Sequence, residues 1–230
     1  MTTRSSITTV PARFLLLGDS HAGPIGRAAQ AADIPFLGGP IGAAREFTDG
    51  FFTPRPDDVE FHSAETEGHY RGFLAELGVT GLGRLPVPLV STFGFAAHFI
   101  ATKENWHLYR TGDGFPPGFL GGPLFDAIVT ETVRDALAFY RHAVALGLRV
   151  CAVLPPQRVP NQSDPAVFLA AQEPVRRAVA DLGVEVVDLR DRITDTTGFQ
   201  RPELCEVDDE IHGNLAWGRI ILRELLDLGL

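Results

Sequence analysis

The sequence predicts an α/β fold in which helices cover both faces of a five-stranded parallel sheet. Short apolar runs alternate along the chain with longer segments whose apolar residues recur at helical spacing. The short runs are apolar throughout, instead of alternating with polar residues, which is typical of strands that are buried on both faces. Together these two patterns favour a parallel sheet between two layers of helices.

The first strand is expected at residues 13–17, where a compact apolar run stops at a Gly-Asp-Ser turn. Residues 22–32 are rich in alanine and predict a helix. Residues 33–37 then predict a second short strand. The glycine-rich cluster at residues 38–42 fits no regular element and predicts a loop at the end of that strand.

The middle of the chain is less regular. Residues 43–65 are rich in Phe, Pro and Asp and predict no regular element, whereas residues 68–77 have helical spacing. Residues 87–93 have the character of a third strand, with its prolines placed at the start. A long stretch rich in glycine, proline and aromatic residues follows, from residue 94 to residue 123.

The second half of the chain returns to a regular pattern. Helices are expected at residues 129–144 and 168–182, each followed by a glycine that stops the helix. Strands are expected directly after these glycines, at residues 148–154 and 184–189. A last helix, at about residues 214–228, completes the chain.

Composition and charge are those of an ordinary soluble enzyme of one domain, which covers residues 1–230 with residues 1–11 as a flexible arm. The chain is 45% hydrophobic and 21% charged, and it is long enough to bury one full core. Its formal net charge of −9 would repel a phosphate backbone. Nucleic acid is therefore not expected as a partner.

The same survey predicts a cytoplasmic protein without a membrane span, because no apolar run has the length of a signal peptide or a bilayer-spanning helix. Cys151 and Cys205 cannot form a disulfide framework and are expected to be reduced. The histidines show neither helical i, i+4 pairs nor a cysteine partner, and no phosphate-binding Gly-Lys-Ser/Thr ending is present. We therefore expect no metal and no cofactor; the pattern makes no prediction of the oligomeric state.

Ser20 is the first candidate catalytic residue. In an open parallel sheet the working groups collect at the carboxyl ends of the strands, and Ser20 follows the first strand directly. The glycine two residues before it permits a tight turn, so that the serine would project from the sheet edge near the start of a helix. The alternative is a serine that only caps that helix.

Asp209 and His212, directly before the last helix, form a second candidate pair. A serine hydroxyl becomes a strong nucleophile when an imidazole removes its proton, and a carboxylate on the other ring nitrogen fixes the tautomer and stabilises the imidazolium. An aspartate three residues before a histidine on a turn allows the two side chains to curl toward one another. The alternatives are a solvated acidic turn, and Asp208 as the partner of His212.

The two ends of the chain together resemble the SGNH hydrolases, also called the GDSL esterase/lipase family. The run FLLLGDSH around Ser20 resembles the block that carries the nucleophile in this family. The run DEIHGN, which holds Asp209 and His212, resembles the last block, Asp-x-x-His, with Gly218 downstream. The resemblance covers essentially the whole chain. It implies a flavodoxin-like three-layer α/β/α sandwich with Ser20, Asp209 and His212 as a catalytic triad.

The resemblance also implies an oxyanion hole made by the backbone N–H of the serine, the backbone N–H of a glycine and an asparagine side chain. Gly42 aligns best with the glycine; the alternative is a plain flexible loop. Ala96 stands where the asparagine is expected, and an alanine side chain donates no hydrogen bond. Either two donors suffice, or His98 or Asn105 supplies the third. We name His98 as the candidate; the alternative is a histidine packed within an aromatic loop.

The activity that the resemblance implies is a serine-dependent hydrolase acting on ester bonds through an acyl-enzyme, with a small-molecule or glycan acyl ester as substrate. Two alternatives stay open: an acyltransferase that passes the acyl group to a hydroxyl acceptor, and a non-catalytic binding module with the same fold. The aromatic residues of segments 43–65 and 94–125 would either form an apolar mouth above the site or cover the sheet.

Overall fold

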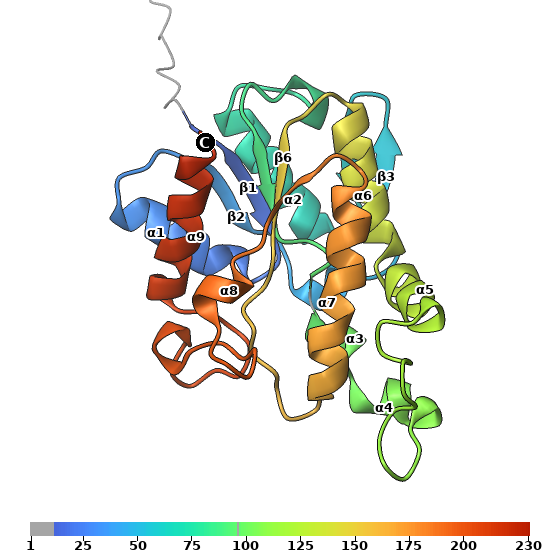
Figure 1. Cartoon of the computed structure of the whole chain (residues 1–230). Coiled ribbons are helices and arrows are strands. Elements are labelled where there is room, and N and C mark those ends of the chain that lie inside the picture. Colours follow the sequence, from blue (N-terminus) through green and yellow to red (C-terminus); the bar gives the residue numbers. More distant parts are fainter. Residues whose placement is uncertain (1–11, 96) are drawn as a thin grey trace, which may run out of the picture.

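A five-stranded sheet, in which every pair of neighbouring strands is parallel, runs through the molecule (Figure 1). The computed structural model describes residues 12–95 and 97–230, so the expected arm at residues 1–11 and Ala96 lie outside the described residues. The strand order is β2-β1-β5-β6-β7. The strands are β1 (Leu15–Gly18), β2 (Leu37–Pro40), β5 (Leu89–Ser91), β6 (Val150–Val153) and β7 (Glu185–Val187).

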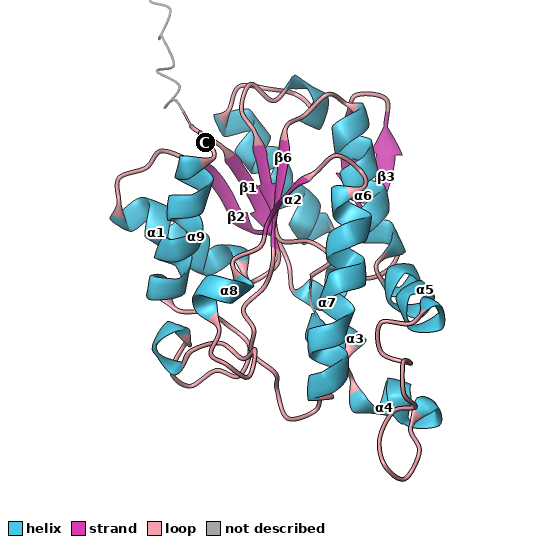
Figure 2. Ribbon diagram, in the orientation of Figure 1, coloured by secondary structure: helices cyan, strands magenta, loops and turns pink. Residues whose placement is uncertain are grey.

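Helices cover both faces of this sheet, which confirms the predicted fold class (Figure 2). One face carries α1 (Ala22–Ala31), α8 (Arg190–Ile193) and α9 (Leu215–Asp227). The other face carries α2 (Ala64–Glu76), α5 (Pro123–Thr132), α6 (Arg134–Ala145) and α7 (Pro165–Ala180). No helix within the described ranges combines the length and the apolar character that crossing a bilayer requires.

Strand β1 shows why the central strands are apolar throughout. Leu15 and Leu17 point into the core beneath α2, α6 and α7, while Phe14 and Leu16 point into the core beneath α1 and α9. All four side chains are 0% exposed. Burying each one contributes about 1.5–3 kcal/mol. Because side chains alternate between the faces of a strand, a strand covered on both sides needs apolar residues at every position.

The prediction for the second strand was wrong in its position. Strand β2 covers Leu37–Pro40 and so includes the glycines that were expected to form a loop. Gly38 has a φ of 98° and lies so close to β1 that a Cβ atom would overlap the carbonyl oxygen of Leu16. The glycines therefore let an edge strand approach its neighbour, which a side chain would prevent.

Several elements were not expected from the sequence. The segment at residues 43–65, expected to be irregular, contains η1 (Ala44–Phe47) and an antiparallel hairpin. The predicted helix at residues 129–144 is two helices, α5 and α6, because the chain leaves helical geometry at Val133, with φ −110° and ψ 15°. The remaining elements are β3 (Phe52–Arg55), β4 (Asp58–Phe61), η2 (Leu82–Arg84), α3 (Ala97–Ile100), α4 (Lys103–Trp106), η3 (His107–Tyr109) and η4 (Pro202–Leu204).

The aromatic residues of the two irregular segments cover the sheet instead of forming an apolar mouth. Their rings pack in the core on the α2 and α6 side, for example Phe51 against Phe47 of the same segment and against Phe93 and Phe139. The fully packed members of this set are Phe47, Phe51, Phe61, Phe95, Trp106 and Phe125. These rings therefore stabilise the fold, because each aromatic side chain buries a large apolar area.

Candidate active site

Ser20 lies in the turn between β1 and α1, at the carboxyl edge of the sheet. The strand order reverses there, since β2 lies on one side of β1 and β5 on the other. Ligand sites of open parallel sheets lie at such a switch point, beyond the carboxyl ends of the strands. Ser20 is also next to the start of α1, where the helix dipole favours negative charge.

Asp19 and Thr92 hold the turn before Ser20 in place. The carboxylate of Asp19, 1% exposed, accepts hydrogen bonds from the N–H of His21 and the hydroxyl of Thr92, both at 2.9 Å. Burial raises the pKa of Asp19 to about 6, although these hydrogen bonds act to lower it. Gly18 is needed because a Cβ atom there would overlap Thr92 Oγ1. Sequence reasoning missed Thr92, since no local pattern points to a partner 73 residues away.

Close packing of the first and last helices brings the second candidate pair to Ser20. Gly218 of α9 lies against α1, where a Cβ atom would overlap the carbonyl oxygen of Pro24. Asn214 caps the start of α9 by accepting hydrogen bonds from the N–H groups of Ala216 and Trp217, at 2.9 and 3.1 Å. The loop that precedes this cap therefore ends at a defined point beside Ser20.

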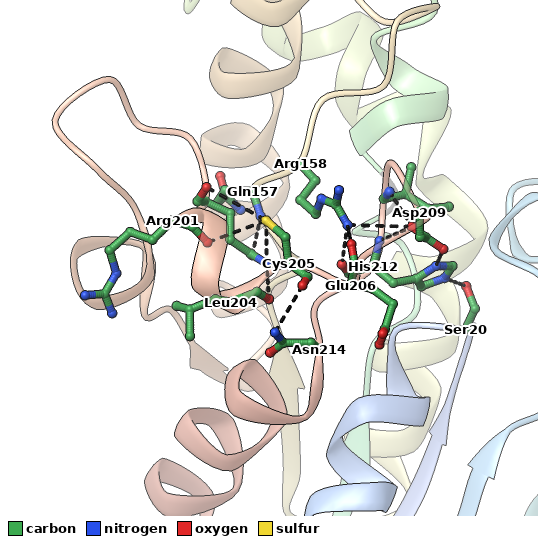
Figure 3. A network of polar contacts seen from close by, with 12 residues as sticks. Ser20, Gln157, Arg158, Arg201, Leu204, Cys205, Glu206, Asp209, His212 and Asn214 are labelled. Atoms are coloured by element: carbon green, nitrogen blue, oxygen red, sulfur yellow. Dashed lines mark hydrogen bonds and ion pairs between the residues drawn. The ribbon is translucent and has the colours of Figure 1, made fainter.

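Ser20, His212 and Asp209 form a continuous hydrogen-bonded line (Figure 3). The distance from Ser20 Oγ to His212 Nε2 is 2.7 Å, and that from His212 Nδ1 to Asp209 Oδ2 is 2.6 Å. Because a carboxylate only accepts, Nδ1 carries the proton and donates it to Asp209. Nε2 is then the acceptor that faces the serine hydroxyl. Asp208, the alternative partner, is exposed.

Asp209 is ionised over the whole neutral and mildly acidic range. Partial burial alone would raise its pKa, but the ring of His212 and the N–H groups of Ile211 and His212 donate to the carboxylate and hold its pKa at about 2. An ionised partner is what a histidine needs to accept a proton from a serine, because the carboxylate then stabilises the imidazolium.

Two further histidines lie beside this line, and sequence reasoning missed the first of them. The ring centroid of His21 is 5.2 Å from that of His212, and the ring of His98 is 6.2 Å from that of His21. Burial lowers the pKa of His21 to about 3 and that of His98 to about 4, and each is lowered further by a neighbouring histidine. Both rings are therefore neutral at neutral pH and add no positive charge beside His212.

The residues expected at the oxyanion hole lie in different elements around Ser20. Gly42 follows β2 at the same edge of the sheet, and a Cβ atom there would lie 2.6 Å from Glu46 Oε2 and 2.8 Å from the ring of Phe47. His98 lies in α3, buried against His21, whereas Asn105 is exposed on α4. Ala96, which replaces the expected asparagine, lies outside the described residues.

A cleft of about 750 Å³ opens beside Ser20 and His212. Arg27 and Glu206 lie in its wall, with Arg27 Nη2 3.3 Å from Glu206 Oε2. Among the described residues no Phe, Tyr or Trp lines this cleft. The same part of the chain holds no cluster of three or more His, Cys, Asp or Glu residues that fits a metal ion.

Comparisons with known proteins identify the fold. No protein-family model and no curated protein matches the sequence. Solved structures do match. A protein described as a lipolytic member of the G-D-S-L family from Desulfitobacterium hafniense DCB-2 has a TM-score of 0.54 at 9% identity, over 94% of this chain and 99% of that one. An SGNH hydrolase from Slackia heliotrinireducens has a TM-score of 0.50 at 14% identity, over 94% and 97%. A lipase/acylhydrolase from Enterococcus faecalis has a TM-score of 0.50 at 15% identity, over 94% and 96%.

At these identities the likeness shows the fold: the chain has the α/β/α fold of the SGNH hydrolases, as the sequence motifs predicted.

Proposed function

We propose that this chain is a serine-dependent hydrolase of the SGNH family that cleaves ester bonds through an acyl-enzyme on Ser20. The observation that carries the proposal is the line from Ser20 Oγ through His212 to Asp209, with both hydrogen bonds shorter than 2.8 Å. This geometry suits proton transfer from a serine hydroxyl to a histidine. The shared fold with SGNH hydrolases supports the same reading.

In the first half-reaction, Ser20 Oγ attacks the ester carbonyl carbon while His212 Nε2 takes the hydroxyl proton. The charge that develops on the carbonyl oxygen is held by the backbone N–H groups of Ser20 and Gly42, with support from the start of α1. The tetrahedral intermediate then releases the alcohol, which leaves with the proton from His212. An acyl group remains on Ser20.

In the second half-reaction, water attacks the acyl carbonyl, and His212 takes the proton of the water. Collapse of the second tetrahedral intermediate releases the carboxylic acid, and His212 returns the proton to Ser20 Oγ, which restores the free enzyme. If a hydroxyl compound attacks in place of water, the same residues carry out acyl transfer.

His98 is the candidate third donor to the oxyanion. Its lowered pKa, about 4, keeps the imidazole neutral, and a neutral imidazole donates one N–H without acting as an acid at neutral pH. Losing one oxyanion donor costs about a hundredfold to a thousandfold in rate. His98→Ala should therefore be slower than the wild type but faster than a variant that lacks Ser20.

For the substrate we propose a small polar molecule or a glycan, because the charged side chains of Arg27 and Glu206 lie in the wall of the cleft, beside apolar residues such as Leu215. The cytoplasmic location expected from the sequence stays a prediction.

Hydrolysis of p-nitrophenyl acetate by the wild type, Ser20→Ala and His212→Ala tests the proposal. We expect each variant to lose about four to six orders of magnitude in rate, since the residues of a triad act as a unit. Adding glycerol and analysing the products separates free acid from transferred ester. Hydrolysis by Ser20→Ala at the rate of the wild type would exclude Ser20 as the nucleophile.

A further inference from the structure

The loop that carries Asp209 and His212 has little packing of its own. Its two ends are joined by an antiparallel bridge between Cys205 and Gly213, and by a 3.1 Å hydrogen bond from the N–H of Glu206 to the carbonyl of His212. The tip points into solvent, with Val207 80% exposed. A loop without a buried apolar anchor has low local stability. Polar contacts from outside the loop therefore hold it: Asn161 Nδ2 donates to Glu210 Oε1 at 3.1 Å and Arg27 pairs with Glu206, both on exposed side chains, while a third contact comes from a more buried arginine.

Arg158 occupies the base of this loop (Figure 3). Its Nη1 donates to the carbonyl of Glu206 at 3.0 Å and to the carbonyl of His212 at 2.8 Å. The same nitrogen lies 3.9 Å from Asp209 Oδ1, and the side chain of Arg158 is only 17% exposed. One guanidinium thus contacts the residues at both ends of the loop, Glu206 and His212, and faces the carboxylate of Asp209.

The residue before Arg158, Gln157, belongs to a buried network of side-chain amides that fixes the backbone at this point. Gln157, 1% exposed, exchanges hydrogen bonds with the side chain of Gln172 at 2.7 Å. Its N–H donates to Gln200 Oε1 at 3.1 Å, and its carbonyl accepts from the N–H of Gln200 at 2.9 Å. These bonds join the end of β6 to α7 and to the segment before the loop. A satisfied buried network of this kind is rigid.

We propose that Arg158 is a positioning residue, which holds the backbone of His212 and the carboxylate of Asp209 in the geometry that proton transfer requires. This inference rests on the proposed function. A guanidinium suits the task because it is always charged and its donors have a fixed direction. Without it, the carbonyls of Glu206 and His212 lose a charged donor, and His212 moves relative to Ser20.

The rate at which a fluorophosphonate labels Ser20 tests this inference, followed by mass spectrometry. We expect Arg158→Met to react about tenfold to a hundredfold more slowly than the wild type, since a misplacement of about 1 Å costs up to about a hundredfold. Arg158→Lys keeps the charge but loses the rigid fork, so its rate should be intermediate. Arg190→Met is the matched control: it removes a similarly buried guanidinium, paired with Asp188 and Glu173, and should leave the labelling rate unchanged.

A double-mutant cycle separates positioning from a general loss of structure. If Arg158 acts through Asp209, then Arg158→Met should cost less than about threefold in an Asp209→Asn background, because residues that act as a unit are not additive. Full additivity would overturn the inference. If Arg158→Met does not fold, Arg158→Lys decides: labelling at the rate of the wild type rejects positioning by Arg158. A wild type that does not label at all rejects the proposed function instead.

Discussion

At the scale of single residues, burial sets which groups of the site carry charge. Asp209 stays ionised, with a pKa of about 2, while His21 and His98 stay neutral. A second imidazolium 5.2 Å from His212 would oppose any positive charge on His212. The residue types and their order along the chain named Ser20, Asp209 and His212 as candidates, and these side chains form one hydrogen-bonded line. They could not predict the neutral state of His21, because its burial depends on α1, α3 and the loop of His212 packing together.

His21 makes stability depend on pH in a direction that can be measured. The pKa of His21 is about 3 in the folded protein and about 6.5 when unfolded. As pH falls below 6.5, the unfolded chain binds a proton that the folded chain does not, so the free energy of unfolding decreases by about 1.4 kcal/mol per pH unit. The decrease in the free energy of unfolding that His21 causes levels off near pH 3, where the folded protein also binds the proton.

His21→Gln should therefore show a shallower loss of stability than the wild type in urea unfolding between pH 6.5 and pH 4.5. Asp19, whose raised pKa acts in the opposite direction, is present in both proteins and cancels in the comparison. His98 acts in the same direction as His21, and its pKa is lowered partly by His21, so the substitution makes the pH slope shallower still. Identical pH slopes would show that the pKa of His21 is the same in the folded and unfolded states.

At the scale of elements, the contact between α1 and α9 sets the distance between Ser20 and His212. Both helices, and β6 and β7, were predictable because their apolar residues recur regularly. Strand β2 and the hairpin of β3 and β4 were not. A glycine-rich edge strand such as β2 owes its conformation to the backbone of β1, and a short hairpin depends on pairs such as Phe52 with Phe61, which local sequence does not reveal.

Gly218→Ala should disturb this contact. A Cβ atom at Gly218 has no room against Pro24, so we expect a loss of about 1–3 kcal/mol in the free energy of unfolding and slower ester hydrolysis. Gly72→Ala is the matched control, because Gly72 lies in α2 with no atom within 4 Å of an added Cβ. That variant should gain about 0.5–1 kcal/mol and keep its activity. A Gly218→Ala protein as stable and active as the wild type would contradict the packing described.

At the scale of the whole molecule, two apolar cores share one sheet. The sheet brings together the segments that carry Ser20 and His212. The fold class was predictable from alternation along the chain. The cleft beside Ser20 and the contacts of Arg158 were not, because they depend on contacts between distant segments, such as Arg158 and His212, which are 54 positions apart in the sequence. Since every central strand contributes to both cores, we expect the chain to unfold as one domain.

The two tryptophans test this cooperativity, because Trp106 lies in one core and Trp217 in the other. Trp106→Phe leaves a reporter of the α1 and α9 side, and Trp217→Phe leaves a reporter of the opposite side. Within each variant, urea unfolding followed by tryptophan fluorescence should coincide with unfolding followed by circular dichroism. Separate transitions would show that the two layers unfold independently.

The most direct test of the catalytic line is to treat the protein with a fluorophosphonate and map the adduct by mass spectrometry. We predict one adduct, on Ser20, that forms rapidly in the wild type, is nearly abolished in His212→Ala and forms measurably but more slowly in Asp209→Asn. An unmodified Ser20, or labelling that proceeds at the same rate without His212, would show that this serine is not activated by its neighbours.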